Sequence, residues 1–397
     1  MKRVYLVSNY FHFKQEKSSN RYRELAEMLS SLEDVEVTVI TSKFYQRIYK
    51  HRTNFDELTK DIPFKAVFTD ELGYDRSICL KRLVSSKSFA NSVMKYLKSA
   101  PIPDVIYQVV PTLDVASKVS RFANKNNIPL VVDVQDLWPE AFKMAIDIPL
   151  VSDIAFLPMK LQANGIYKRA DRVCAVSETY VERVLSVNKK CNNGQAVFIG
   201  INLKNFDKYA AQNKVEKSDR LRLAYCGSLS KSYNIKMVID ALSMMKNPPE
   251  LICMGDGNDR QYLENYAKEK GVDAVFTGFI EYSKMCGMLC SCDITVNPIL
   301  GKSVASIINK HGDYAASGLP VLNTQESAEY KKLVTDYNMG FNCKSDDAES
   351  LAEKIEILCS DAQLREEMGK NARRCAEEKF DRAHTYLKLV DTVRALL

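Results

Sequence analysis

Short apolar runs alternate with helical stretches through the first half of the chain. Five runs have the length and composition of buried strands, and the segments between them carry hydrophobic residues at helical spacing. The predicted strands are Val4–Val7, Val35–Ile40, Val105–Tyr107, Leu130–Val132 and Arg172–Val176, and helices are predicted over 23–29, over 113–124 and after Ser177. Strands that alternate with helices indicate a parallel, doubly wound sheet.

The pattern restarts after residues 201–220, a polar segment that we predict to be a linker. The second series of strands is Leu221–Gly227, Glu250–Met254, Val275–Gly278, Ile294–Val296 and Val321–Leu322, with a helix over 235–245. We therefore expect an α/β fold of two Rossmann-like domains, at 1–200 and 221–375. Because ligands of such sheets bind at the carboxyl ends of the strands, the expected site is a cleft between the domains.

A helical segment closes the chain. Leu387, Val390, Val393 and Leu396 are spaced for one buried face, within a terminal helix that we place at 376–397. The chain has 397 residues, 46% hydrophobic and 27% charged, which is the content of an ordinary globular protein. No run approaches the roughly 18 apolar residues that cross a bilayer, and the apolar run after Met1 is too short for a signal peptide. We expect a cytoplasmic protein.

Eleven cysteines are scattered singly, and an odd number without a secretion signal argues against a disulfide framework. Cys286, Cys290 and Cys292 lack a fourth ligand, so their spacing favours a buried helix over a zinc site. No Asp-x-Asp occurs, and no G-x-G-x-x-G follows the first strand of either domain. We therefore predict no metal or other cofactor, and we disfavour a dinucleotide oxidoreductase.

Positive charge is concentrated in the first half. Residues 1–200 hold 29 Lys and Arg against 22 Asp and Glu, a net +7, so the remainder carries −1 of the total +6. The stretch Arg76–Ser99 combines apolar residues with five further basic ones and contains no acid. It is either a helix that lies on an anionic membrane surface or an ordinary surface helix of the first domain.

Candidate chemistry gathers in the second domain, between Ser306 and Val321. Lys310 and Asp313 stand on a short helix, where the helix N-terminus and a lysine suit a diphosphate and the acid can accept hydrogen bonds from sugar hydroxyls. Gly227 ends the first strand and precedes a polar loop with Ser228 and Lys231, where backbone N–H groups can hold phosphate. A glycine required only for a tight turn is the alternative.

These segments resemble the donor-binding segments of retaining family-4 glycosyltransferases, with the form S-x-x-x-K-x-x-E-Y-x-A-x-G-x-P-V. The resemblance implies a GT-B fold whose last helix crosses back to the first domain. It also implies donor contacts from further residues, namely Ser306, Asn309, Tyr314, the turn at Gly255 and Asp256, and a base-contacting loop at Phe279.

The chain departs from the family pattern at several positions. Ser228 stands where Arg is common, and Tyr233-Asn234 stand where Lys-Gly is common. Asp313 replaces the second of two glutamates, and Ala305 replaces the first. These departures remove charged groups from the expected donor site.

Residues 133–140 resemble the D-L-W-P-E element of transferases in bacterial surface-polysaccharide assembly. The resemblance implies a catalytic role for Asp136 and places Asp133 and Trp138 on the acceptor side, together with Asn20 and Arg21 of the N-terminal loop. In the alternative interpretation, Asp136 caps a helix and Trp138 belongs to the core.

The function implied is transfer of a hexosyl or N-acetylhexosaminyl group from a UDP-sugar to a polyprenyl-diphosphate-linked saccharide in capsule, exopolysaccharide or O-antigen assembly, on the inner face of the membrane. The resemblance also implies retention of configuration without a metal, with Lys310 and Lys231 stabilising the leaving diphosphate. Nucleic acid is not an expected partner. Two alternatives remain, a UDP-sugar 2-epimerase of the same fold and a non-catalytic partner of a transferase complex, the latter motivated by Ala305 and Ser228.

Overall fold

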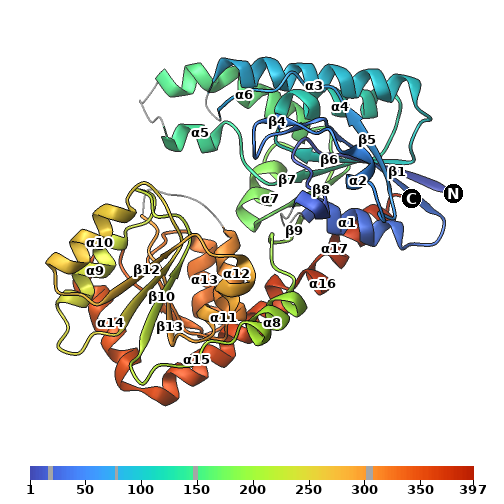
Figure 1. Ribbon diagram of the computed structural model, residues 1–397. Coiled ribbons are helices and arrows are strands. Elements are labelled where there is room, and N and C mark those ends of the chain that lie inside the picture. Colours follow the sequence, from blue (N-terminus) through green and yellow to red (C-terminus); the bar gives the residue numbers. More distant parts are fainter. Residues whose placement is uncertain (17–20, 77–78, 146–150, 301–306) are drawn as a thin grey trace. The chain divides into compact units, whose positions relative to one another are not determined.

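The computed structural model describes residues 1–16, 21–76, 79–145, 151–300 and 307–397. The chain forms two compact units, the first made of Met1–Val197 and Tyr386–Leu397 and the second of Phe198–Thr385. Each unit holds one parallel sheet with helices on both faces (Figure 1). The predicted α/β fold of two Rossmann-like domains is confirmed.

The first unit is built on a sheet of order β5-β2-β1-β6-β7-β8-β9. Its strands are β1 Lys2–Val7, β2 Val35–Ser42, β5 Lys65–Thr69, β6 Val105–Val110, β7 Leu130–Val134, β8 Arg172–Ala175 and β9 Gln195–Ala196. All neighbouring pairs are parallel. Every residue of β6 and β7 is buried, as expected for central strands covered on both faces.

Helices cover both faces of this sheet. One face packs against α3 Leu80–Ser99, α4 Leu113–Lys125, α6 Val151–Tyr167 and α7 Glu178–Leu185. The other packs against α1 Arg21–Ser30 and α17 Leu387–Arg394. The shorter elements are the antiparallel pair β3 Phe44–Tyr45 and β4 Lys50–His51 and the helices α2 Phe55–Leu58 and α5 Glu140–Ala145.

The second unit has a parallel sheet of order β12-β11-β10-β13-β14-β15. Its strands are β10 Arg222–Cys226, β11 Glu250–Met254, β12 Ala274–Gly278, β13 Ile294–Asn297, β14 Val321–Asn323 and β15 Gly340–Asn342. The strand order reverses between β10 and β13, and in such sheets this reversal marks the place where ligands bind.

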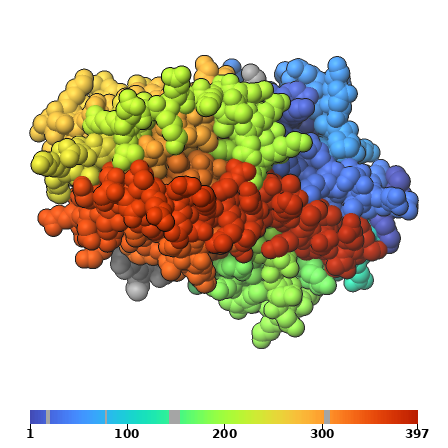
Figure 2. Space-filling view, turned by 90° about the horizontal axis from the view of Figure 1, so that it is seen from below, coloured from blue at the N-terminus to red at the C-terminus, as the bar shows by residue number. Residues whose placement is uncertain are grey.

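One face of the second sheet packs against α9 Ile235–Ser243, α10 Arg260–Glu269 and α14 Ala348–Ser360. The other packs against α8 Leu203–Gln212, α11 Tyr282–Leu289, α12 Asn309–Ala316, α13 Ala328–Asp336 and α15 Ala362–Cys375. The orange-red helices α14 and α15 lie at the surface (Figure 2). Among the described residues, no helix combines the length and apolar character needed to span a bilayer.

The prediction of a linker at 201–220 is wrong for its first half. Residues 203–212 form α8, which Asn202 caps by accepting a hydrogen bond from the Asn205 N–H at 2.9 Å. Leu203 and Phe206 are buried in the core of the second unit. Tyr209 and Ala210 are partly buried against the same core, and α8 packs on α11.

The terminal segment is not one helix over 376–397. A π-turn at Ala376–Phe380 and the short helix α16 Arg382–Thr385 still belong to the second unit, and the chain enters the first unit at Tyr386. The buried face of α17 carries Leu389, Val390 and Val393, whereas Leu387 is about half exposed (48%). Only two of the four residues predicted to form that face are buried.

Candidate functional site

Two loops meet at the carboxyl edge of the second sheet. Gly227, directly after β10, has a φ of 140° and donates its N–H to the Met254 carbonyl at 2.9 Å. A Cβ on Gly255 would overlap the Gly227 carbonyl, and a Cβ on Gly257 would overlap the Leu229 carbonyl. Glycine is therefore required because the loops pack backbone against backbone, with Gly227 in a conformation that side chains rarely adopt.

Lys310 reaches this glycine from the first turn of α12. A Cβ built on Gly227 would lie 2.6 Å from the Lys310 Nζ. The same Nζ lies 3.3 Å from the Tyr225 hydroxyl, 4.4 Å from the centroid of the Tyr225 ring and 3.7 Å from that of Tyr233. Two aromatic faces therefore hold the ammonium group beside the glycine loop.

Burial sets the charge of Lys310. It lowers the pKa of the lysine to about 7, against weaker opposing effects of Cys226 and Asp313. No carboxylate in the described part of the chain lies within ion-pair distance of the Nζ. A lysine of this kind gains most from an anionic ligand, because the ligand supplies the missing counter-charge.

Asp313 stands one turn further along α12. Its Oδ1 accepts a hydrogen bond from the Tyr282 hydroxyl at 2.7 Å. Burial raises the pKa of this carboxyl to about 6, with Tyr282, Arg382 and Lys310 acting in the opposite direction. The group is therefore mostly ionised at neutral pH and can accept further hydrogen bonds.

His311, between these two residues, anchors the start of α12. Its Nδ1 accepts the Ile308 N–H at 3.2 Å, its Nε2 lies 3.2 Å from the Asn297 side-chain nitrogen, and its ring stacks on Tyr330 at 3.5 Å. Burial holds the pKa of His311 well below its usual value. The neutral imidazole therefore positions the helix that carries Lys310.

Tyr314 does not belong to a ligand surface, so its assignment to donor binding is wrong. The side chain is 1% exposed, and its hydroxyl accepts the Cys226 N–H at 2.9 Å. The ring fixes the end of β10 from within the core. Asn309 is exposed at the start of α12, whereas Ser306 and Ala305 lie outside the described residues.

The remaining donor-side candidates are exposed around the same edge. Ser228 and Lys231 are exposed, and the Ser228 carbonyl accepts the Tyr225 hydroxyl at 2.7 Å. Asp256 accepts the Gly257 N–H at 2.8 Å. Phe279, one residue beyond β12, is 84% exposed, an unusual position for a large apolar ring.

Arg260 is a basic residue of this edge that the sequence patterns did not single out. It donates to the Phe276 carbonyl at 3.0 Å and to Glu264 at 2.8 Å, and it lies 3.7 Å from Asp256. The guanidinium thus braces the end of β12, directly before Phe279. Asp256, four residues before Arg260 in the G-x-G turn, did not indicate this contact from the sequence alone.

In the first unit, Asp133 and Arg21 form a buried ion pair. The Arg21 Nε donates to Asp133 Oδ2 at 2.9 Å and its Nη2 to Oδ1 at 3.2 Å, while the Tyr107 hydroxyl donates to Oδ2 at 2.6 Å. Both side chains are fully buried, and the guanidinium lies over the Tyr386 ring. Their assignment to the acceptor side is therefore wrong, because the pair joins β7, α1 and the returning chain inside the core.

Asp136 and Trp138 instead lie at the carboxyl edge of the first sheet, after β7. Trp138 donates its indole N–H to Asp136 Oδ2 at 3.0 Å, and burial raises the pKa of this carboxyl. The tryptophan is only partly buried, and α5 begins at Glu140 without a cap from Asp136. The alternative is therefore wrong for the helix cap but holds in part for the tryptophan, which packs against the core of the first unit while its indole N–H faces Asp136.

Arg82 of α3 joins this pair. Its guanidinium carbon lies 5.4 Å from the Trp138 ring centroid and 5.8 Å from that of Tyr74, and its Nη2 donates to the Tyr10 hydroxyl at 3.1 Å. A cation, a carboxylate and an aromatic wall therefore share one edge of the first sheet. Arg82 lies far from residues 133–138 in sequence, so no local motif predicted the contact.

The chain is similar to known glycosyltransferases. Residues 207–375 match the family model described as Glycosyl transferases group 1. A 182-residue segment, 43% of this chain, is 28% identical to the Campylobacter jejuni enzyme named GalNAc-alpha-(1->4)-GalNAc-alpha-(1->3)-diNAcBac-PP-undecaprenol alpha-1,4-N-acetyl-D-galactosaminyltransferase. The match covers 48% of that enzyme, about half of its length.

Solved structures match over the whole chain. Anabaena Alr3699/HepE in complex with UDP superposes with a TM-score of 0.69 at 15% identity, with 100% of both chains covered. Sucrose-phosphate synthase from Thermosynechococcus elongatus gives 0.73 at 17% identity, covering 100% of this chain and 99% of the other. At such identities the likeness establishes the fold, which is GT-B.

The match to the Glycosyl transferases group 1 model lies within the second unit. In this GT-B chain, the structure brings together Gly227, Ser228, Gly255 and Lys310 at one sheet edge, with Asp313 on the same helix as the lysine. It places Asp136 and Trp138 together at the edge of the first sheet. Tyr314, Arg21 and Asp133 are buried in the core. Asn20 lies outside the described residues.

Proposed function

We propose that this GT-B protein transfers a hexosyl or N-acetylhexosaminyl group from a UDP-sugar to a saccharide acceptor. One observation carries the proposal: the Lys310 ammonium lies against Gly227 at the carboxyl edge of the sheet in the unit that matches the Glycosyl transferases group 1 model. Aromatic faces surround the lysine, and no carboxylate among the described residues forms an ion pair with it. A diphosphate at the glycine loop would complete its coordination.

The other donor contacts follow from the groups at the same edge of the sheet as Lys310. Asp313, ionised at neutral pH, suits the ribose hydroxyls. The exposed ring of Phe279 suits a nucleobase, since a flat apolar face gains from stacking. Lys231, exposed on the loop after β10, is the second cation available to the diphosphate.

The reaction proposed is a displacement with retention of configuration and without a metal ion. The bond between the anomeric carbon and the diphosphate oxygen breaks, and a bond from the acceptor oxygen forms on the same face of the sugar. The acceptor proton passes to the departing diphosphate, so no protein nucleophile is needed. Lys310 stabilises the charge that develops on the leaving group.

For the acceptor, we propose a saccharide linked to polyprenyl diphosphate, in the assembly of a surface polysaccharide. The Campylobacter relative supports this choice, because its name describes an undecaprenol-linked acceptor. The first unit offers Trp138 as a wall for a sugar face, Asp136 as a hydroxyl ligand and Arg82 as a cation for an acidic group.

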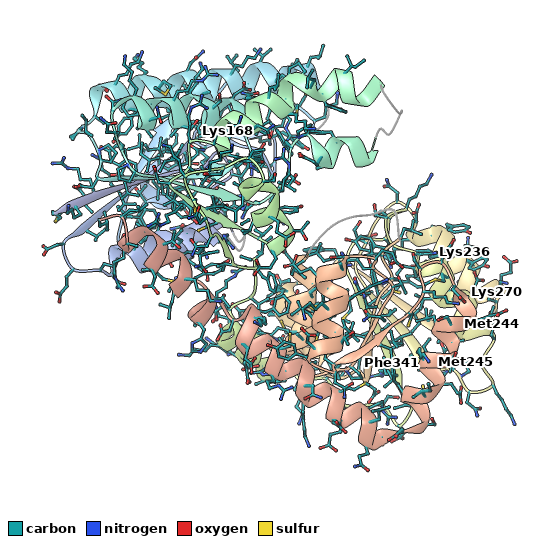
Figure 3. All side chains as sticks on the ribbon, turned by 180° about the vertical axis from the view of Figure 1, so that it is seen from behind. Lys168, Lys236, Met244, Met245, Lys270 and Phe341 are labelled. Carbon is teal, nitrogen blue, oxygen red and sulfur yellow. The ribbon has the colours of Figure 1, made fainter. Side chains whose placement is uncertain are left out.

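Calorimetric titration of the full chain with UDP, ADP and GDP tests the donor site. We expect UDP to bind, Lys310→Ala to weaken binding at least tenfold and Lys270→Ala to leave it unchanged. Lys270 follows α10 at the opposite edge of the sheet, 3.6 Å from Asp240 (Figure 3). Absence of UDP binding would instead support a non-catalytic partner subunit.

Incubation with UDP-sugars, with and without lipid-linked oligosaccharides, tests the reaction. A transferase releases UDP and extends the acceptor, and Asp136→Asn should abolish extension while UDP still binds. An isomerised donor formed without acceptor would show that the protein is an epimerase and not a transferase.

A further inference from the structure

Six large apolar side chains on two helices of the first unit face solvent. Leu80 is 80% exposed on α3, and Ile154 is 69% exposed on α6. The others are exposed by about half, and the set is Leu80, Leu83 and Val84 of α3 and Ile154, Leu157 and Leu161 of α6. Isolated exposed leucines are ordinary, but three exposed apolar side chains on each of two helices that pack against α4 are not.

The two helices share one face of the first unit. Both α3 and α6 pack against α4, and Figure 1 shows them on the same outer side of the sheet. The buried sides of the helices are separate from the exposed ones, with Phe89, Val93 and Leu97 of α3 and Ala163 and Ile166 of α6 in the core. The exposed residues are therefore not needed to hold the fold together.

Basic residues predominate along these two helices, and Asp153 in the first turn of α6 is the one acidic residue within their ranges. No Asp or Glu occurs at 76–103 or at 154–170. Lys81, Lys87 and Lys95 are exposed on α3, and Lys160 is exposed on α6, with Lys168 just after it (Figure 3). Lys81 lies 3.2 Å from Asp75, and that aspartate precedes the helix.

We propose that the outer face of α3 and α6 docks on an anionic membrane surface. Apolar side chains flanked by lysines suit the boundary between acyl chains and anionic headgroups. A second copy of this chain fits less well, since two such faces would bring like charges together. The surface lies in the first unit, so the proposal and the donor site can fail independently.

Arg82 links the exposed face of α3 to the sheet edge that carries Trp138. It lies on the same turns of α3 as Leu80, Leu83 and Val84, yet its guanidinium faces Tyr10 and Trp138 at the edge of the sheet. Docking of these leucines would therefore hold the acceptor edge at headgroup level. If the acceptor is lipid-linked as proposed above, its diphosphate would lie at that same level.

Vesicle co-sedimentation of the full chain tests the docking surface. We expect binding to vesicles of 30% phosphatidylglycerol and 70% phosphatidylcholine in 50 mM salt, at least tenfold weaker binding to pure phosphatidylcholine, and a similar loss in 500 mM salt. The double variant Leu83→Ser, Leu157→Ser should lose at least tenfold in affinity, and Lys87→Gln, Lys160→Gln should lose severalfold.

Met244→Ser is the matched control. Met244 is 57% exposed on the second unit (Figure 3), so its loss should leave vesicle binding unchanged. UDP affinity and thermal unfolding should be the same in all variants, which separates docking from folding and from the donor site. The proposal would be overturned if the wild-type protein did not bind anionic vesicles, or if the leucine variant bound them as tightly as the wild type. It would also be overturned if the wild-type protein formed a dimer without binding vesicles and the leucine variant did not form that dimer.

Discussion

At the residue scale, the charge state of Lys310 links the structure to function. Two tyrosine rings surround the ammonium group, and no described carboxylate neutralises it. Tyr225 and Cys226 of β10, Tyr233 of the loop, and His311 and Asp313 of α12 are the titratable groups around it. Its pKa of about 7 means that the free protein exists in both charge states near neutral pH.

The affinity for UDP should therefore fall as the pH rises above 7. A bound diphosphate favours the ammonium form, so binding above pH 7 requires uptake of a proton, and affinity should drop by up to about tenfold per pH unit. The phosphates of UDP are already ionised in this range. Titration calorimetry between pH 7 and 9 measures the slope. Lys310→Arg keeps its charge and should give a flat profile, and a flat wild-type profile would contradict the account.

Substitution of Asp133 should lower stability much more than substitution of Asp136. Asp133→Ala leaves Arg21 buried without its carboxylate, which should lower the free energy of unfolding by about 3–5 kcal/mol. Asp136→Ala removes a partly buried carboxyl at the sheet edge and should lower it by no more than about 1 kcal/mol. Urea denaturation measures both. Equal losses of stability in the two variants would contradict the assignment of Asp133 to a buried ion pair in the core.

Sequence patterns predicted where the motif residues after the strands lie, but they did not predict which side chains from different elements contact one another. The donor segment and the glycine loop were predictable because both follow strands at recognisable motifs. Tyr314 and Arg21 were misassigned because a polar atom in a motif need not face a ligand: the Tyr314 hydroxyl fixes the Cys226 backbone, and Arg21 pairs with Asp133. Arg82 was missed because its partners come from distant parts of the chain.

At the element scale, α8 was hidden by composition. Half of its residues are polar, yet it packs on α11 so closely that a Cβ on Gly287 would overlap the carbonyl of Asn213, the residue that follows α8. Helix α3 was ambiguous for a related reason. Its C-terminal half is an ordinary core-packing helix, and its N-terminal half leaves leucines exposed. The same hydrophobic spacing in α3 therefore marks a buried face in its C-terminal half and an exposed apolar face in its N-terminal half.

Gly287→Ala should destabilise the second unit by about 1–3 kcal/mol, because the new methyl group must displace backbone. Gly165→Ala is the matched control in a helix of the first unit. Its nearest neighbour is the Arg169 guanidinium, which can move, so this change should be neutral or slightly stabilising. Thermal unfolding compares them. A neutral Gly287→Ala would show that α8 does not pack on α11 as described.

At the scale of the whole molecule, two separate segments of the chain form the first unit. They are its first 197 residues and its last twelve. Tyr386, Leu389, Val390 and Val393 are buried in the core that α1 and the first sheet form. This return is where the sequence pattern was least informative, since the helical spacing continues through 360–397 without marking the change at Tyr386.

Deletion of residues 386–397 should therefore unfold the first unit selectively. Each buried apolar side chain contributes about 1.5–3 kcal/mol, so losing four removes much of the stability of a single domain. Limited proteolysis should cut within 1–197 while UDP still binds to the second unit. Resistance of the first unit to proteolysis in the truncated chain would contradict this division.

Hydrogen-exchange mass spectrometry of the full chain with and without UDP tests the nucleotide site most directly. The account predicts slower exchange in the loop after β10, the turn at residues 255–257 and the first turn of α12, with the protection abolished in Lys310→Ala. Protection confined to other segments, or equal protection in Lys310→Ala, would contradict it.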